Sequence, residues 1–355
     1  MLNERRKSRK IQVGNIFVGG DSKITVQSMT NTDSADFDAT YAQIKKLENA
    51  GCEIVRMTVP DESAVRTVAR LKESDVNIPI VADIHFDYKM AIESAEAGAD
   101  KIRINPGNIG GDDRVKAVVD ACRSKNVPIR IGVNSGSLEK NILAKYGRPC
   151  GEALAESALY HASLLEKYDF YDIILSVKSS RVSEMIKANT ILAEQCDYPL
   201  HLGVTEAGTL HKGLIKSSAG IGSLLLNGIG DTIRVSLTDD PVQEVIEGRA
   251  ILSALGIEES SGVNVISCPT CGRTKIDLIG IVNEFERRMG EIKCDRKIDV
   301  AIMGCVVNGP GEAKECDIGI AGGVGEAVLF KKGEVIRKIS EERIIDELIQ
   351  EINRL

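Results

Sequence analysis

The chain is dominated by a repeated alternation of short β-branched runs with longer amphipathic segments, which starts near residue 24. Segments such as Asp38–Ala50 and Arg114–Lys125 have helical periodicity and separate the runs. The eight runs are Ile24–Gln27, Ile54–Met57, Ile78–Ala82, Lys101–Ile104, Ile129–Val133, Asp172–Val177, Leu200–Val204 and Thr232–Val235. Strand and helix patterns in alternation predict right-handed crossovers and a parallel sheet. Eight such units match the strand count of a TIM (β/α)8 barrel, which takes about 250 residues.

A doubly wound parallel sheet is the alternative arrangement. It is disfavoured because no Gly-x-Gly-x-x-Gly sequence opens a helix after the first run. The chain has 355 residues, which leaves room for a second, smaller domain. A polar, turn-rich stretch at 258–262 marks the boundary. We therefore expect an α/β chain with an N-terminal TIM barrel at residues 1–258, followed by a small C-terminal α+β domain at residues 263–355.

The C-terminal part has its own alternation of patterns. A strand is expected at Val263–Ile266, a helix at Lys275–Gly290 and a charged closing helix at Ser340–Leu355. Further strands are expected at 298–303, 317–321, 326–330 and 334–338.

Polar side chains gather where the eight barrel runs end. In a TIM barrel these C-terminal strand ends and the loops after them form the active site. The candidate residues are Arg56, Asp83, His85, Arg103, Asn105, Arg130, Asn134, Lys178, Glu206, Arg234 and Ser236. Five of them are cations. Because a guanidinium group binds phosphate oxygens bidentately, we expect a ligand with more than one phosphate. Any single cation could instead pair with a carboxylate or lie on the outer surface, but this is a poor explanation for all five.

Asp83, His85 and Glu206 are the candidates for proton transfer, because carboxylates and imidazole are the usual acid–base groups. A lone histidine is as often a structural hydrogen-bonding group. Two glycine pairs, Gly220/Gly222 and Gly228/Gly230, lie between the seventh and eighth runs. This region often binds phosphate in barrels through backbone N–H groups, so the glycines weakly predict a phosphate site.

Three cysteines on two turns indicate a metal site in the C-terminal domain. Cys268 and Cys271 form a Cys-x-x-Cys pair, and Cys305 follows the strand expected at 298–303, with Glu312 nearby. Structural zinc is one interpretation, with Cys294 or Cys316 as the fourth ligand. An iron–sulfur cluster with one exchangeable position is the second. A thioredoxin-like redox pair is the weakest, because it leaves Cys305 unexplained.

Composition limits the classes of function. The net charge of −7 argues against nucleic-acid binding. No apolar run approaches the ~20 residues that a membrane span needs, and the basic N-terminus lacks the apolar core of a signal peptide. The nine cysteines are an odd number without secretory context. They point to a reducing compartment, so we expect a cytoplasmic protein.

Several long motifs resemble the GcpE (IspG) family of 4-hydroxy-3-methylbut-2-en-1-yl diphosphate synthases, in its short, bacterial two-domain form. The resemblance extends over essentially the whole chain. The motifs are Val26–Thr30, Ile102–Asn108, Ile215–Ser218, Asp231–Leu237, Ser267–Arg273 and Gly304–Glu312.

The resemblance implies a [4Fe-4S] cluster held by Cys268, Cys271, Cys305 and Glu312, which makes the second domain an iron–sulfur domain. It also implies reductive ring opening and dehydration of 2-C-methyl-D-erythritol 2,4-cyclodiphosphate in the non-mevalonate isoprenoid pathway. Two electrons would come from reduced flavodoxin or ferredoxin. The family's short members further imply a homodimer in which the cluster domain of one subunit closes over the barrel of the other.

We expect the barrel cations, with Asn105 and Ser236, to hold the cyclic diphosphate. Asn134 and Glu206 would position and protonate the departing oxygen, with Asp83 and His85 as second choices, and Glu312 would give way to the substrate during catalysis. Two other functions stay open: another cluster-dependent phosphosugar reductase or dehydratase, and a non-redox phosphate-binding barrel with a structural zinc domain.

Overall fold

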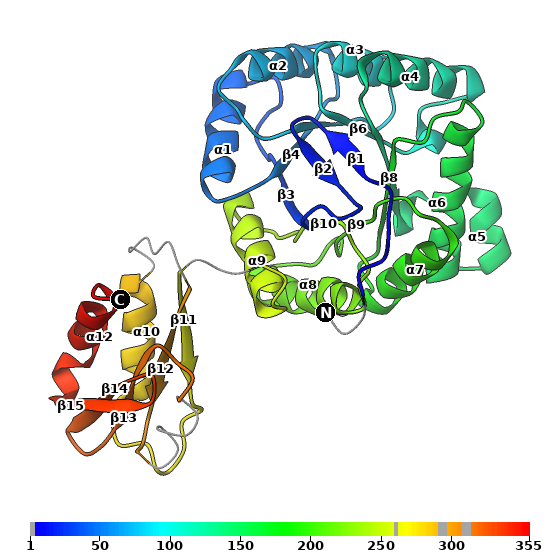
Figure 1. Cartoon of the computed structure of the whole chain (residues 1–355). Coiled ribbons are helices and arrows are strands. Elements are labelled where there is room, and N and C mark those ends of the chain that lie inside the picture. The colour runs from blue at the N-terminus through cyan, green and yellow to red at the C-terminus, as the bar shows by residue number, and fades with distance from the viewer. Residues whose placement is uncertain (1–3, 259–261, 290–296, 307–313) are drawn as a thin grey trace. The chain divides into compact units, whose positions relative to one another are not determined.

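The computed structural model describes residues 4–258, 262–289, 297–306 and 314–355. The chain forms two compact units, Met1–Glu258 and Glu259–Leu355 (Figure 1). Each unit has its own hydrophobic core. Among the described residues no helix has both the length and the apolar character needed to cross a membrane.

The first unit is a parallel barrel, as the alternating pattern predicts. Its eight strands follow the order β8-β7-β6-β5-β4-β3-β10-β9. A parallel bridge between Leu175 and Leu200 joins the two ends of this order. The strands are β3 (Thr25–Met29), β4 (Ile54–Thr58), β5 (Ile80–Asp83), β6 (Lys101–Ile104), β7 (Ile129–Asn134), β8 (Ile173–Lys178), β9 (His201–Leu202) and β10 (Thr232–Ile233).

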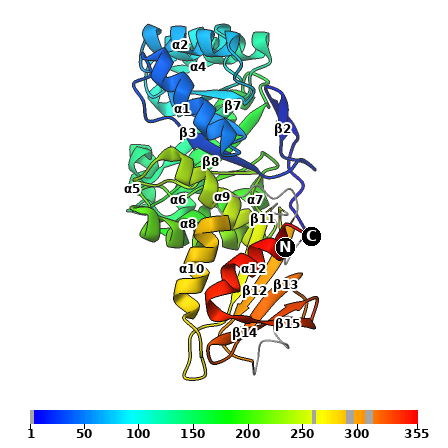
Figure 2. The same cartoon turned by 90° about the vertical axis from the view of Figure 1, so that its left-hand side faces the viewer.

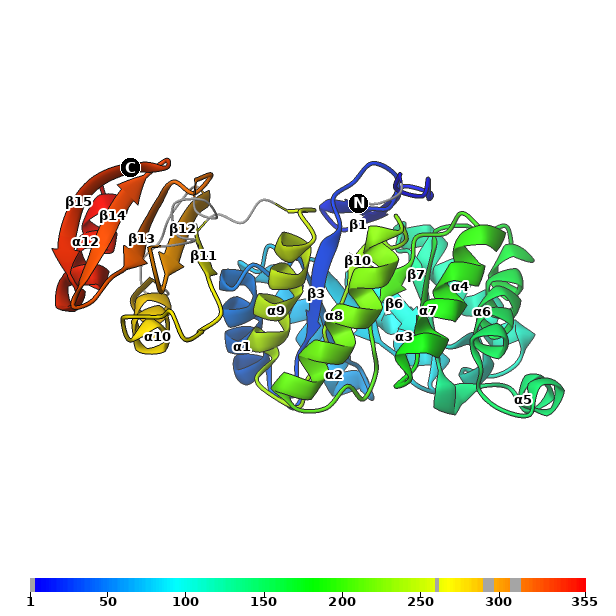
Figure 3. The same ribbon diagram turned by 90° about the horizontal axis from the view of Figure 1, so that it is seen from below.

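Helices form the outer layer of the barrel (Figure 3). Aspartate side chains cap several of them: Asp61, for example, accepts hydrogen bonds from the backbone N–H groups of Ser63 and Ala64 at the start of α2. The core of the unit lies between the strands and the apolar faces of these helices. The helices are α1 (Phe37–Asn49), α2 (Glu62–Glu73), α3 (Tyr88–Glu96), α4 (Asp112–Lys125), α5 (Lys140–Tyr146), α6 (Gly151–Glu166), α7 (Val182–Gln195), α8 (Leu210–Leu226) and α9 (Pro241–Ala254), with 3-10 turns η1 (Pro106–Asn108) and η2 (Ser135–Ser137).

A hairpin of β1 (Ile11–Val13) and β2 (Ile16–Val18) packs against one end of the barrel interior. Its apolar side chains form a cluster with Ile54, Val81 and Ile174, which lie near the N-terminal ends of their strands. The hairpin lies across the barrel opening in Figure 1. The sequence pattern does not predict it, because its strands are only three residues long.

The glycines between the seventh and eighth strands make packing contacts, and these contacts give no support to the phosphate site expected at these residues. Gly220 and Gly222 lie inside α8, and a Cβ atom at Gly220 would lie 3.0 Å from Val204 Cγ2. Gly228 lies against the backbone of Glu4, and Gly230 lies against Leu202. Gly228 and Gly230 precede β10 and so belong to the end of the barrel opposite the C-terminal strand ends.

The second unit is a five-stranded mixed sheet with the order β11-β12-β13-β14-β15. Helices α10 (Leu278–Met289) and α12 (Ile344–Ile352) share one core cluster with the strands and lie on the same face of the sheet (Figure 2). The 3-10 turn η3 (Glu341–Arg343) leads into α12. The strands are β11 (Gly262–Ser267), β12 (Lys297–Met303), β13 (Ile318–Gly322), β14 (Glu326–Lys331) and β15 (Glu334–Ser340).

Candidate active site

A polar cavity of about 160 Å³ lies at the C-terminal ends of the barrel strands. Nearly all of its lining side chains come from the last residues of a strand or the first residues after it, as strand alternation in a TIM barrel requires. The lining residues are Met29, Arg56, Asp83, His85, Arg103, Arg130, Gly132, Asn134, Ser176, Lys178, Thr205, Arg234 and Ser236.

Asp83 is the carboxylate that lines this cavity, and it connects three basic side chains. Its Oδ1 accepts a hydrogen bond from Arg103 Nη1 at 2.9 Å, and its Oδ2 lies 3.6 Å from Arg56 Nε. His85 Nε2 lies 3.9 Å from the same Oδ2. Burial by itself would raise the pKa of Asp83, but the charges of Arg56 and Arg103 outweigh it and lower the pKa to about 2. Asp83 is therefore a carboxylate at neutral pH.

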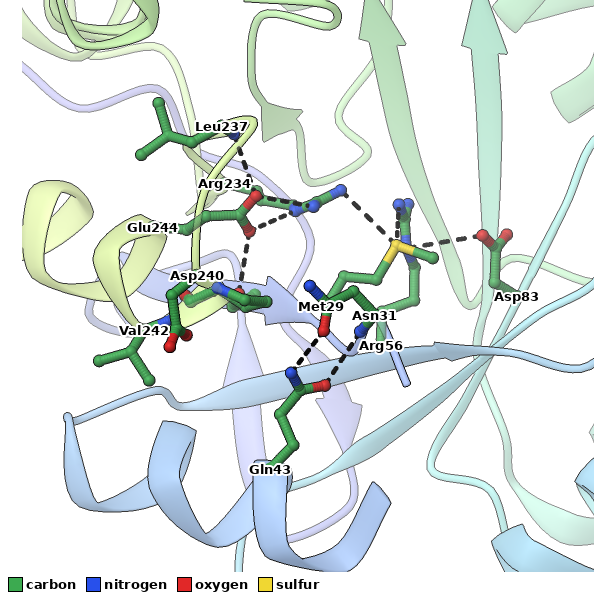
Figure 4. A network of polar contacts seen from close by, with 12 residues as sticks. Met29, Asn31, Gln43, Arg56, Asp83, Arg234, Leu237, Asp240, Val242 and Glu244 are labelled. Atoms are coloured by element: carbon green, nitrogen blue, oxygen red, sulfur yellow. Dashed lines mark hydrogen bonds and ion pairs between the residues drawn. The ribbon is translucent and has the colours of Figure 1, made fainter. Parts of the chain in front are cut away.

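Arg234 is held by Glu244, which reaches the site from α9 (Figure 4). Arg234 Nε donates to Glu244 Oε2 and Nη2 donates to Oε1, both at 3.0 Å. Glu244 also accepts hydrogen bonds from Ser28 Oγ at 2.9 Å and from the backbone N–H of Leu237 at 3.1 Å. These contacts saturate the carboxylate and fix the direction of the guanidinium group.

The thioether of Met29 lies between two arginines (Figure 4). Its Sδ accepts hydrogen bonds from Arg56 Nε at 3.1 Å and Nη2 at 2.7 Å, and Arg234 Nη1 lies 3.7 Å away. A weak, uncharged acceptor at this place holds both guanidinium groups without neutralising them.

Arg130 and Lys178 are almost fully buried and form no ion pair with any described residue. Burial, together with nearby arginines, lowers the pKa of both side chains well below the ordinary value. Glycines make room for the cations: a Cβ atom at Gly203 would lie 2.8 Å from Lys178 Nζ, and one at Gly132 would overlap Arg103. The cavity thus holds cations whose charges the described protein residues do not balance.

Most of the residues expected at the strand ends lie together in this cavity. Asn105 and Glu206 do not line it. The Asn105 side chain accepts a hydrogen bond from the backbone N–H of Gly107 at 3.0 Å and caps η1. Glu206 is exposed, with a backbone φ of 52°, and its neighbour Thr205 lines the cavity instead. The sequence reasoning did not identify Met29, Thr205 or Glu244.

In the second unit, backbone hydrogen bonds join the two segments that carry the cysteines. The N–H of Gly304 donates to Cys268 Sγ at 3.3 Å. The N–H of Lys275 donates to the carbonyl oxygen of Gly304 at 3.0 Å. Cys268 and Cys305 are partly exposed and Cys271 is exposed, whereas Cys316 is buried. The first three thiols are therefore accessible on adjacent segments.

The structure does not describe Glu312 or Cys294, which lie in 307–313 and 290–296. Within the described part of the chain, no group of three Cys, His, Asp or Glu side chains is gathered closely enough to hold a metal ion. The donor chemistry of three accessible thiols on two hydrogen-bonded segments is nevertheless that of a thiolate metal site.

Comparisons with known proteins cover the entire chain. Residues 8–249 match the GcpE TIM-barrel domain and residues 264–354 match the GcpE protein C-terminal domain. A Clostridium acetobutylicum protein named 4-hydroxy-3-methylbut-2-en-1-yl diphosphate synthase (flavodoxin) is 58% identical over 352 residues, which are 99% of this chain and 100% of the relative. A Caldanaerobacter subterraneus protein with the same name is 58% identical over 355 residues, 100% of this chain and 99% of the relative.

Among solved structures, a type I 3-dehydroquinate dehydratase from Clostridium difficile is similar with a TM-score of 0.52 and 16% identity. The match covers 70% of this chain and 97% of that one, and it supports the barrel fold alone.

Proposed function

The chain belongs to the GcpE family, and from this premise we propose that it catalyses the reductive ring opening of 2-C-methyl-D-erythritol 2,4-cyclodiphosphate to 4-hydroxy-3-methylbut-2-enyl diphosphate. One bond between carbon and a diphosphate oxygen breaks, and one hydroxyl group leaves as water. The step consumes two electrons. The name of the close relatives supports flavodoxin as the electron donor, and ferredoxin is the alternative.

The charge of the barrel cavity is the observation that carries this proposal. Five basic side chains line it, and of the residues that the structure describes only Asp83 and Glu244 pair with them. Five cations less two carboxylates leave three formal positive charges. A cyclic diphosphate has two negative charges, and opening the ring frees one further phosphate oxygen. The excess positive charge therefore suits the charge that develops on the leaving diphosphate.

The barrel residues divide into binding and proton-transfer roles in this proposal. Arg56, Arg103, Arg130, Lys178 and Arg234 bind the diphosphate, with Ser236 beside Arg234 and with Asn105 supporting the loop after β6. The ion pairs of Asp83 favour a positioning role over proton donation. His85 lies half-exposed at the rim of the cavity, and Asn134 lines it. His85 and Asn134 are therefore better placed to direct a proton to the departing oxygen. Glu206 is exposed and would have to turn inward to take part.

We propose that Cys268, Cys271, Cys305 and Glu312 hold a [4Fe-4S] cluster. When bound, such a cluster supplies electrons one at a time and a Lewis-acidic iron at its exchangeable position. The hydrogen bond from Gly304 to Cys268 Sγ would stabilise a thiolate there. We further propose a cytoplasmic homodimer, in which the cysteine-bearing unit of one subunit serves the barrel of the other.

Anaerobic spectroscopy with turnover assays tests the proposal. The purified protein should be brown, contain about four irons and four sulfides per chain, and convert the cyclodiphosphate when reduced flavodoxin is supplied. Cys305→Ser should lose the colour and the turnover. Cys196→Ser is the matched control, because Cys196 lies in the barrel unit, where its Sγ donates to the carbonyl oxygen of Leu192 at the end of α7.

A colourless protein with one zinc would instead indicate a non-redox phosphate-binding barrel with a structural zinc domain. A brown protein that does not open the cyclodiphosphate would indicate another cluster-dependent phosphosugar reductase or dehydratase. Subunit exchange tests the dimer. Lys178→Met and Cys305→Ser should each be inactive alone. When the two variants are mixed and exchange subunits, turnover should recover if the barrel of one chain works with the cysteine-bearing unit of the other. No recovery would contradict the proposed assembly.

A further inference from the structure

Polar side chains fill part of the barrel interior next to the candidate active site. Strand alternation turns them inward, because their neighbours Val26, Ile102, Leu202 and Ile233 belong to the core between the sheet and the helices. Each is at most 1% exposed. The side chains are Thr25, Gln27, Lys101, Arg130, His201 and Thr232.

These side chains come from strands on different sides of the barrel and meet in its interior. Thr25, Thr232 and His201 are in register on β3, β10 and β9. His201 Nδ1 lies 3.4 Å from Thr232 Oγ1. In the order of the barrel strands, β7 lies opposite β3 and β6 lies opposite β10. The inward side chains of Arg130 and Lys101 therefore face those of Gln27 and Thr232 across the interior.

Most of the polar atoms in this cluster lack a hydrogen-bond partner among the described residues. These atoms are Thr25 Oγ1, both amide atoms of Gln27, Lys101 Nζ, Arg130 Nε and Nη1, and His201 Nε2. Leaving one buried polar group unpaired costs about 1–3 kcal/mol. Seven such atoms on the inward side chains of one barrel favour a bound polar species.

The charge of the cluster indicates the sign of that species. Lys101 and Arg130 are basic side chains, and no described carboxylate pairs with either. Asp100 is the acid that acts on Lys101, but its oxygens are taken by Lys72 Nζ at 2.7 and 2.9 Å and by the backbone N–H of Ile80 at 2.8 Å. The other atoms are mainly donors or can turn to donate. An excess of unpaired donors around two basic side chains suits an anion.

Enclosure limits the size of the anion. The β1–β2 hairpin packs on Ile54, Val81 and Ile174 and covers the N-terminal end of the interior. Arg130 lines the active-site cavity, whereas Thr25, Gln27, Lys101, His201 and Thr232 do not. A species surrounded by such deeply buried side chains must be small and must lose its hydration shell. Because the free-energy cost of dehydration rises with the charge of the ion, a monovalent ion is favoured over a multivalent one.

We propose that Lys101 and Arg130, with Gln27 and Thr25, bind one small monovalent inorganic anion of halide type inside the barrel. The site is separate from the substrate cavity and shares only Arg130 with it. The anion would bind Arg130 through Nε and Nη1, which have no partner among the described residues. This inference goes beyond the proposed function and does not depend on it. Burial lowers the pKa of Lys101 well below its ordinary value, and a bound anion opposes that shift by favouring the protonated amine.

Thermal unfolding of the full-length protein tests this site. Chloride should raise the melting temperature relative to gluconate of equal ionic strength, by roughly 3–6 °C at a chloride concentration about tenfold above Kd. Lys101→Met removes the amino group and keeps most of the side-chain volume, so it should abolish the chloride effect. Lys46→Met is the matched control, since Lys46 is exposed on α1, and it should keep the effect.

The substrate cavity could also bind chloride, and the Lys101→Met variant separates the two sites because it leaves that cavity intact. An equal chloride effect in wild type and Lys101→Met overturns the proposal. Crystals grown with bromide provide an independent measurement that needs no variant. An anomalous peak within hydrogen-bonding distance of Lys101 Nζ and Arg130 Nη1 is the expected result. Water at that position, or bromide confined to the substrate cavity, would refute the site.

Discussion

Arg234 and Glu244 form a bidentate ion pair in which two guanidinium nitrogens each lie 3.0 Å from a different carboxylate oxygen. The pair connects the last barrel strand to the helix that follows it. Both side chains are largely buried, at 14% and 3% exposure. Its geometry turns the remaining Nη1 of Arg234 toward Met29 Sδ. A carboxylate outside the cavity therefore sets the direction of a cation inside it.

Glu244→Gln tests this relationship. The amide has one acceptor oxygen in place of two and carries no negative charge, so the buried guanidinium group loses its charged partner at a cost of about 3–5 kcal/mol. We expect a lower free energy of unfolding and a KM for the cyclodiphosphate that rises about tenfold or more. Glu247→Gln is the control, because Glu247 lies on the same helix and pairs with no described cation. Equal effects of the two substitutions would argue against a specific role for the pair.

Met29→Leu tests the sulfur between Arg56 and Arg234. Leucine keeps the volume but removes the acceptor, and such exchanges usually cost less than about 1.5 kcal/mol of stability. We expect a folded protein whose KM rises severalfold while kcat changes less, because the arginines lose alignment with the diphosphate. Steady-state kinetics of Met29→Leu are compared with those of Met57→Leu, because Met57 is buried in the core outside the cavity. An unchanged KM would show that the sulfur contact is incidental.

The low pKa of Asp83 predicts that this residue contributes less to the free energy of unfolding in acid. Its folded pKa is about 2, below the ordinary value of 3.8, so its ionised form stabilises the fold. This contribution is fully present above about pH 4 and is lost as the pH falls toward 2. At about 1.4 kcal/mol per pH unit it amounts to roughly 2–3 kcal/mol.

Urea unfolding of the barrel at several pH values measures this contribution. The stability difference between wild type and Asp83→Asn should be constant from neutral pH down to about pH 4 and should shrink below it. Asp38→Asn, at an exposed position in the first turn of α1, should show no comparable pattern. A difference that does not change with pH would mean that Asp83 acts through packing alone.

The sequence predicts the barrel site well where a side chain stands on a strand. Arg56, Asp83, Arg103, Arg130, Lys178 and Arg234 all follow from strand position and alternation. Met29 could have been found in the same way, because it is in register with Arg56 on the neighbouring strand. It was missed because methionine is usually read as core packing.

The residues that sequence reasoning misplaced or missed lie on loops and helices. Asn105 and Glu206 follow their strands, where alternation no longer fixes the direction of a side chain. Glu244 looks like any other glutamate on a surface helix, and only the turn after β10 brings it back to Arg234. The β1–β2 hairpin has strands too short to give a periodic signal. Local pattern cannot specify features that arise from tertiary contacts.

The pairing of β3 with β10 has a consequence for how the chain is made. It brings Thr25 beside Thr232, so the first barrel strand acquires its second neighbour only when more than two hundred residues have been synthesised. The hairpin that precedes it needs Ile174 for its docking surface and must also wait. During translation the nascent barrel is an open sheet with unpaired edges, which is a state that aggregates readily. The exposed edge of β3 is therefore covered only after the ribosome has synthesised β10.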